Sequence, residues 1–203
     1  MSAGNTDKRT VDQTTFCAKV INYEHAEVHE GSSFHFGYTT TTAATDDHRT
    51  AIAFKTPNTT KWGHLTVTVT ASQPAEFFLL EGPTTLDVDK GSDGTILNRN
   101  RNSTNASVML SNETAAEAGK VTTYTEAQVV VADGGANFAV SGTTIEYVVL
   151  AGGNGPFRVG GMTRGAAEVI LKKNTLYMFL LQNIGNNANI HLINLDWYEH
   201  TNL

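Results

Sequence analysis

Cysteine is nearly absent from the 203-residue chain, which has only Cys17. A single thiol excludes an internal disulfide framework and a zinc site built on several cysteines. Long apolar runs are also missing, because no stretch approaches the roughly 18 apolar residues that a membrane-spanning helix needs. The first fifteen residues are polar and lack the apolar core of a secretory signal. We therefore expect a soluble protein that folds in a reducing cytoplasm and does not contact membranes.

Charged residues are scarce as well. They make up 17% of the chain, below the usual proportion of about 25%, and the formal net charge is −6. Binding to nucleic-acid phosphates needs a basic surface, so this balance excludes strong non-specific nucleic-acid binding. Proline is rare, with 4 residues, whereas the chain holds 29 Thr, 18 Gly and 17 Asn. Thr suits a pleated strand, and Gly and Asn suit turns, so the composition favours an all-β fold.

Short runs of alternating apolar and polar residues follow the first fifteen. In the clearest run, Leu65, Val67 and Val69 alternate with threonines, which is the period of a half-buried strand. No segment predicts a helix of more than two turns, and no repeat or linker divides the chain. We predict a flexible N-terminal arm over residues 1–15 and one domain over residues 16–203, an antiparallel β-sandwich with a jelly-roll-like topology. The expected strands lie around 34–38 and 52–54 and at 64–70, 76–81, 95–98, 107–110, 121–131, 143–150, 168–171 and 175–183.

The last apolar run predicts an irregular strand. Ile190 and Leu192 share one parity, whereas Leu195 and Trp197 share the other. A regular strand cannot place both pairs on its core face, because side chains alternate between the two faces. We therefore expect a β-bulge near residues 193–194.

Residues 22–29 hold the strongest candidate for a metal site. On a strand, His25, Glu27 and His29 would fall on one face, where two imidazoles and a carboxylate could bind a metal ion. The alternative is a strip of polar residues that faces solvent or another subunit. We favour this alternative, since the spacing differs from the His-x-His pair of cupin-type jelly-roll enzymes. The sequence thus predicts no metal and no other cofactor.

Other motifs point to no reaction. Residues 87–94 have the wrong register for a calcium loop, and the glycine-rich segment 152–161 lacks the ending of a phosphate-binding loop. No Gly-x-Ser-x-Gly motif occurs, and Cys17 has no recognisable catalytic partner. Trp62 and Trp197 lie within or beside strand patterns, which favours core or strand-end positions over sugar-stacking platforms. We therefore predict that the protein is not an enzyme and has no catalytic residues.

Three segments resemble a known family. They are Ile21-Asn-Tyr-Glu-His25 with Val28-His29, the segment Thr56-Pro-Asn-Thr-Thr-Lys-Trp-Gly-His64, and Leu195-Asp-Trp-Tyr-Glu-His200, and residues 155–161 and 171–177 fit the same pattern. In these segments the chain resembles virion proteins of tailed bacteriophages, specifically the small β-sandwich decoration (cement) proteins of the capsid. The resemblance spans most of residues 20–200 and supplies no catalytic residue.

The resemblance implies a structural function in the virion. A protein of this kind is made in the cytoplasm of the host bacterium, binds the major capsid protein on the outer capsid surface, and commonly forms a homotrimer. The first alternative is a module of a head or tail fibre that binds host-surface glycans. A cupin-like metalloenzyme is the second alternative and depends entirely on His25, Glu27 and His29. The absence of any motif with catalytic spacing favours the decoration protein.

Overall fold

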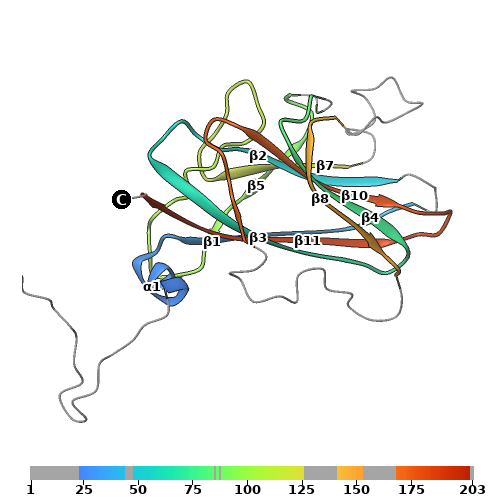
Figure 1. Ribbon diagram of the computed structural model, residues 1–203, viewed down its shortest axis with the longest axis horizontal. Coiled ribbons are helices and arrows are strands. Elements are labelled where there is room, and N and C mark those ends of the chain that lie inside the picture. The colour runs from blue at the N-terminus through green and yellow to red at the C-terminus, as the bar shows by residue number, and fades with distance from the viewer. Residues whose placement is uncertain are drawn as a thin grey trace, which may run out of the picture.

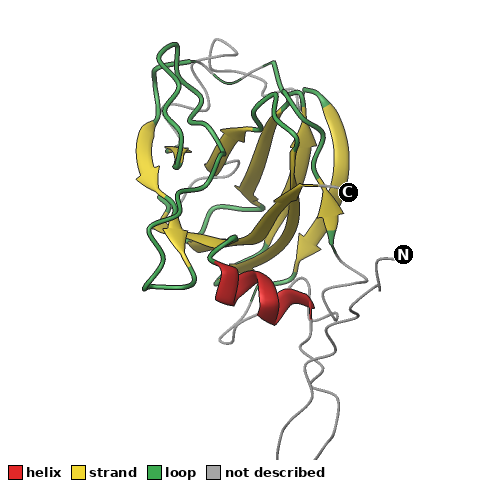
Figure 2. Ribbon diagram, turned by 90° about the vertical axis from the view of Figure 1, so that its left-hand side faces the viewer, coloured by secondary structure: helices red, strands yellow, loops and turns green. Residues whose placement is uncertain are grey.

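The computed structural model of the protein describes residues 23–43, 48–84, 86, 88–125, 141–152 and 168–201. These residues form two antiparallel sheets packed against each other (Figure 1), and a short helix lies at one end of the sandwich (Figure 2). The predicted all-β sandwich is therefore confirmed. The predicted arm over residues 1–15, Cys17 and most of segment 152–161 lie outside the described residues.

One helix and eleven strands make up the regular structure of these ranges. In chain order they are α1 (Tyr23–Glu30), β1 (Ser33–Thr41), β2 (Arg49–Lys55), β3 (Lys61–Ala71), β4 (Ala75–Glu81), β5 (Ser92–Thr95), β6 (Leu97–Asn98), β7 (Lys120–Tyr124), β8 (Thr143–Leu150), β9 (Val169–Ile170), β10 (Leu176–Asn183) and β11 (Ile190–Thr201). No helix in the described ranges has the length and apolar character needed to cross a membrane.

Eight of the strands are arranged as a jelly roll. The sheets have the orders β6-β1-β11-β3-β9 and β5-β7-β2-β10-β4-β8. Without the strands β5, β6 and β7, which lie between β4 and β8 in the chain, the first sheet reads β1-β11-β3-β9 and the second β2-β10-β4-β8. The chain alternates between the sheets through β1, β2, β3 and β4, and again through β8, β9, β10 and β11. This strand order is that of a jelly roll and agrees with the predicted topology.

Aromatic side chains fill the space between the sheets. The Trp197 ring of β11 lies 6.0 Å from the Phe34 ring of β1 and 6.0 Å from the Phe54 ring of β2, measured between centroids. Phe54 in turn packs 5.5 Å from Phe179 of β10. All four side chains are at most 2% exposed. Because each aromatic ring buries about 150–250 Å² on folding, this group contributes strongly to holding the sheets together.

A second apolar cluster covers the outer face of the six-stranded sheet. It includes Ala51 and Ala53 of β2, Leu80 of β4, and Met178 and Leu180 of β10. Strands β2, β4 and β10 are therefore apolar on both faces, which explains why the sequence of 76–81 shows a continuous apolar run instead of an alternation.

The last strand differs from its prediction. Strand β11 pairs without a register shift with both β1 and β3, so the bulge expected near residues 193–194 is wrong. His191 is fully buried, whereas Ile190 is 50% exposed. A polar residue thus takes the inward position at the start of the strand. The prediction was wrong because it assumed that the apolar residues Ile190 and Leu192 face the core. An irregularity occurs elsewhere, between Leu79 and Leu80, where β4 pairs with β8.

Two further predictions of secondary structure are wrong. Residues 107–110 do not form a strand; Leu110 makes isolated bridges with Lys55 of β2 and with Ala118, and Val108 donates its N–H to Glu199 of β11. Residues 23–30 form the helix α1, where no helix was predicted and where the candidate metal site assumed a strand. The helix ends at Gly31, which has φ +74° and donates its N–H to the carbonyl of Val28, while the N–H of Ser32 bonds to Glu27 O. These two bonds form a Schellman motif, which terminates helices at a glycine.

Candidate functional site

A cavity of about 390 Å³ lies at one edge of the five-stranded sheet. It opens between the start of β3 and the turn that leads from β9 to β10, and it is lined by Lys61, Trp62, residues 170–173 and Thr175. Because β9 is the last strand of this sheet, the cavity lies beside the edge of the sheet. We call it the Trp62 cavity.

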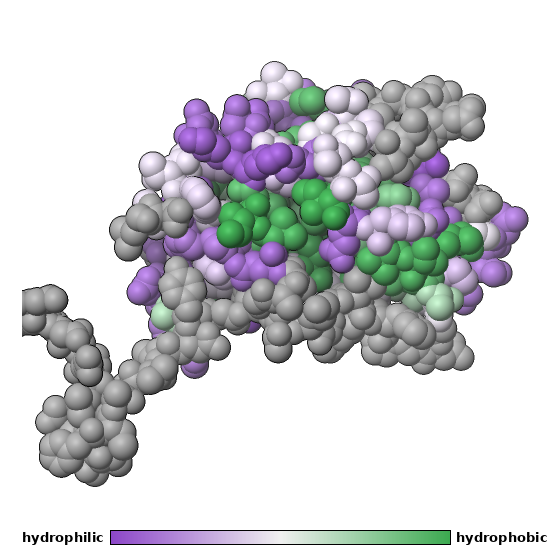
Figure 3. All heavy atoms as spheres, viewed as in Figure 1, coloured by the Kyte–Doolittle hydropathy of each residue, from purple (hydrophilic) through white to green (hydrophobic). Residues whose placement is uncertain are grey.

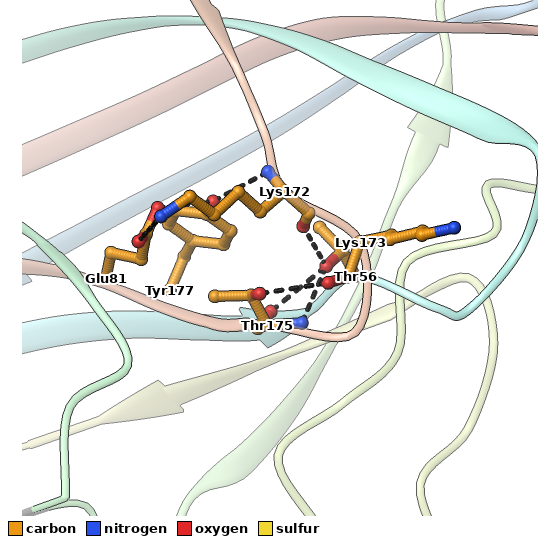
Figure 4. Close-up of polar contacts among 6 residues, drawn as sticks. All are labelled: Thr56, Glu81, Lys172, Lys173, Thr175 and Tyr177. Atoms are coloured by element: carbon orange, nitrogen blue, oxygen red, sulfur yellow. Dashed lines mark hydrogen bonds and ion pairs between the residues drawn. The ribbon is translucent and has the colours of Figure 1, made fainter.

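The turn that forms one wall of the cavity is fixed by the hydroxyl groups of two buried side chains (Figure 4). The Thr56 hydroxyl accepts a hydrogen bond from the N–H of Thr175 at 2.9 Å and donates one to the carbonyl of Lys172 at 2.5 Å. The Tyr177 hydroxyl accepts a hydrogen bond from the N–H of Lys172 at 2.8 Å. The two ends of the turn are thus tied to the residue that follows β2 and to β10.

One lysine of the turn is neutralised by an acidic residue. Lys172 Nζ lies 2.5 Å from Glu81 Oε1, and the Tyr177 hydroxyl donates to Glu81 Oε2 at 3.0 Å (Figure 4). The hydrogen bond from Lys172 holds the pKa of Glu81 below its ordinary value. Burial raises the pKa of Tyr177 to about 12, which disfavours ionisation of its hydroxyl further. Lys172, Glu81 and Tyr177 are therefore joined to one another by hydrogen bonds at the start of the turn.

Four other side chains of the cavity present apolar surface or positive charge to solvent. Trp62 is 40% exposed and Ile170 is 52% exposed. Lys61 and Lys173 are also exposed, and neither makes an ion pair with any residue in the described ranges. The cavity thus combines an aromatic surface with two ammonium groups that are available to an anion.

A cluster of aromatic and acidic side chains adjoins the cavity on the outer face of the sheet. The His64 ring lies 4.6 Å from the Tyr198 ring and 4.5 Å from the His200 ring, and His64 Nδ1 is hydrogen-bonded to Glu168. The Tyr198 hydroxyl donates to the same Glu168 oxygen at 2.9 Å. Burial lowers the pKa of His200, and the neighbouring His64 lowers it further.

His64 is poorly placed to act as a general base through its Nε2 atom. His64 Nε2 is buried and has no hydrogen-bond partner within the described ranges. A general base must lie within hydrogen-bond reach of the proton that it removes, and a buried nitrogen cannot reach a substrate from solvent. The ring contacts and hydrogen bonds of the cluster join β3, β11 and the segment before β9.

The candidate metal ligands do not share one face. His25 and His29 are exposed neighbours on α1, and their rings stack with centroids 4.8 Å apart. Glu27 is only 5% exposed and accepts hydrogen bonds from the hydroxyl and backbone N–H of Ser32 through its side-chain and backbone oxygens, respectively. The helical period separates Glu27 from the two histidines, so the shared face that a strand would give these three residues does not occur. No group of three potential ligands from His, Cys, Asp and Glu occurs among the described residues.

The two tryptophans have different environments. Trp197 is fully buried, as predicted for a core residue, whereas Trp62 lies at the start of β3 and is partly exposed in the cavity. Sequence reasoning did not single out Lys61, Ile170 or Lys173 as site residues. The adjacent lysines at 172–173 and the Lys61–Trp62 pair were the available signals, but only the jelly-roll topology brings these two segments together. Comparison of the chain with protein-family models, curated proteins and solved structures gives no match.

Proposed function

We propose that this protein is a non-enzymatic structural protein of a bacteriophage virion, which binds the major capsid protein on the outer capsid surface and stabilises the capsid. The segments at 21–29, 56–64 and 195–200 support the proposal through their resemblance to decoration proteins. The net charge of −6 supports a position outside the shell, away from the packaged DNA.

The structural observation that carries the proposal is an exposed apolar strip on β8, an edge strand of the six-stranded sheet. Its side chains Ile145, Tyr147 and Val149 are 39%, 50% and 56% exposed. Tyr147 packs 4.9 Å from the Phe78 ring of β4, which joins this β8 strip to the outer apolar cluster. Hydrophobic residues gather over the ends of β4 and β8 in Figure 3. Exposed apolar edges favour association with another protein surface.

Binding of this kind would stabilise a capsid by mass action. A protein that binds the assembled lattice but not the free subunits favours the lattice by its differential affinity. At a concentration 100 times the dissociation constant, each site contributes about 2.7 kcal/mol. Many occupied sites would together resist the outward pressure of the packaged genome.

Substitution in the β8 strip tests the proposal. Val149→Thr keeps the side-chain shape but places a hydroxyl in the contact, whereas Val88→Thr makes the same change at a turn residue that is 47% exposed. We expect Val149→Thr to weaken binding to expanded phage heads about tenfold, which corresponds to about 1.4 kcal/mol, and Val88→Thr to leave it unchanged. Co-sedimentation with heads that lack the protein measures both affinities. Absence of saturable binding by the unsubstituted protein would refute the proposal.

The Trp62 cavity favours a second function, a module that recognises host-surface glycans. An exposed tryptophan beside unpaired lysines is a surface on which a carbohydrate can bind. Binding to host cells together with failure to bind heads would favour this second function.

A further inference from the structure

We propose that the Trp62 cavity binds an acidic sugar unit of the uronic or sialic acid class. This inference concerns a ligand of the isolated protein, and it does not depend on attachment to a capsid. The structure supports it through the exposed apolar surface, the local charge and the shape of the cavity.

The apolar surface matches one face of a sugar ring. Trp62 and Ile170 are 40% and 52% exposed, although the chain buries its other tryptophan completely. The face of an indole ring carries partial negative charge, which attracts the weakly positive C–H groups that line one side of a pyranose. Stacking of a sugar on Trp62 would remove apolar area from water at both surfaces.

The positive charge of the cavity favours a ligand that carries a carboxylate. The chain as a whole has a net charge of −6, yet three lysines line this cavity. Glu81 neutralises Lys172, whereas neither Lys61 nor Lys173 makes an ion pair within the described ranges, and Lys61 interacts only electrostatically with the buried Glu199. A carboxylate beside one of these ammonium groups would form a charge-assisted hydrogen bond, which is about twice as strong as a neutral one.

The shape of the cavity favours a sugar over an extended polymer. Its volume of about 390 Å³ is at the lower end of ordinary ligand sites, of about 300–1,000 Å³. At this cavity a peptide could add a strand only along β9, and this edge strand has two residues. A nucleic-acid strand needs a basic groove that follows its backbone, but the two available cations belong to one cavity.

The wall of the cavity is also preorganised. Hydrogen bonds of Thr56 and Tyr177 hold the turn at both ends, and Asn174 within it has φ 52° and donates its N–H to Pro57 O at 3.3 Å. A ligand that binds here would therefore not have to order the turn, which lowers the entropic cost of binding.

The two indole N–H signals in an NMR spectrum provide a direct test. We expect N-acetylneuraminic acid or glucuronic acid to shift the Trp62 signal saturably at millimolar concentration, while the buried Trp197 signal stays in place. Glucose, which has no carboxylate, should bind at least fivefold more weakly. Added salt should weaken binding of the acids only, because it screens the ammonium–carboxylate attraction.

Three substitutions separate the contributions of the indole ring and of the ammonium group to sugar binding. Trp62→Ala should abolish binding, as followed by backbone signals of residues 170–175, and Lys173→Gln should weaken binding of the acids at least fivefold without affecting glucose. Lys90→Gln removes an exposed lysine from the turn before β5 and should have no effect. Unchanged melting temperatures show that the variants are folded.

Three results would overturn the inference. They are the absence of a saturable Trp62 shift, equal affinity for glucose and the acidic sugars, and tighter binding of uridine monophosphate or of an acidic peptide. None of these measurements involves phage heads, so their outcome is independent of whether the protein binds a capsid.

Discussion

His191 shows how one buried residue can set the acid sensitivity of this protein. The side chain is fully buried at the start of β11, where its ring nitrogens are 3.1 Å from Thr50 Oγ1 and 2.9 Å from Asn183 Oδ1. A neutral imidazole satisfies both groups by accepting from the hydroxyl and donating to the amide oxygen. Burial lowers the pKa of His191 from 6.5 to about 4, and the charge of His48 adds to this shift.

We therefore predict that stability falls as the pH is lowered from about 6.5 to about 4. In this range the unfolded chain binds a proton at this histidine and the folded chain does not, so acid favours unfolding. The shift corresponds to a loss of roughly 3 kcal/mol across the range. Urea unfolding of His191→Gln should show a smaller dependence on pH, although the variant is less stable at pH 7. His29→Gln, at an exposed position of α1, should keep the unsubstituted profile, and identical slopes for all three proteins would contradict the prediction.

At the scale of elements, the end of α1 depends on the backbone freedom of Gly31. The Schellman motif needs a positive φ there, and a Cβ atom at this position would lie 2.2 Å from Ser103 Oγ. Gly82 provides a matched control, because it has φ +63° and a Cβ atom there would meet nothing within 4 Å.

We predict that Gly31→Ala destabilises the protein more than Gly82→Ala does. Both changes strain a left-handed backbone, which costs about 1 kcal/mol, and only the first also displaces the segment at Ser103. Chemical denaturation measures both changes in the free energy of unfolding. Equal losses for the two variants would mean that the contact with Ser103 relaxes freely.

The sequence predicted most elements because their side chains alternate or form continuous apolar runs. Strands β1 to β4, β8 and β10 follow from these patterns. The eight residues of α1 contain too few apolar side chains to show a helical period, so only Gly31 marked the end of the helix. In β11 the inward positions include His191 and Glu199, which is 2% exposed and bonded to Trp197 Nε1 at 2.9 Å. Because such inward positions are polar, the alternation of apolar residues in the sequence does not show which side chains of the strand face the core.

The Trp62 cavity could not be predicted for a different reason. Its walls come from residues 61–62 and 170–175, and the hydroxyl that anchors the turn belongs to Thr56. These segments meet because β9 pairs with β3 and β10 pairs with β2. Local patterns carry no information about such pairings, which depend on the topology of the whole domain.

At the scale of the whole molecule, we propose that the protein forms a homotrimer. The proposal comes from the resemblance to decoration proteins, and closed cyclic symmetry would limit the number of open sheet edges. Light scattering with size-exclusion chromatography should give three times the chain mass of 21.9 kDa at tens of micromolar. A monomer mass would contradict the prediction. If Val149→Thr dissociated the trimer into monomers, this result would indicate that the β8 strip contacts a neighbouring subunit instead of the capsid.

The position of β11 between β1 and β3 has a consequence for how the chain folds. Strand β1 begins at Ser33 and β11 ends at Thr201, yet the two are paired along nine residues. The five-stranded sheet, with Trp197 at its centre, therefore cannot form on the ribosome until almost all of these residues have been synthesised. Proteins dominated by such distant pairings fold slowly, in about milliseconds to seconds. We thus expect the domain to fold after translation, as one cooperative unit, and a chain that stops before β11 to remain unfolded.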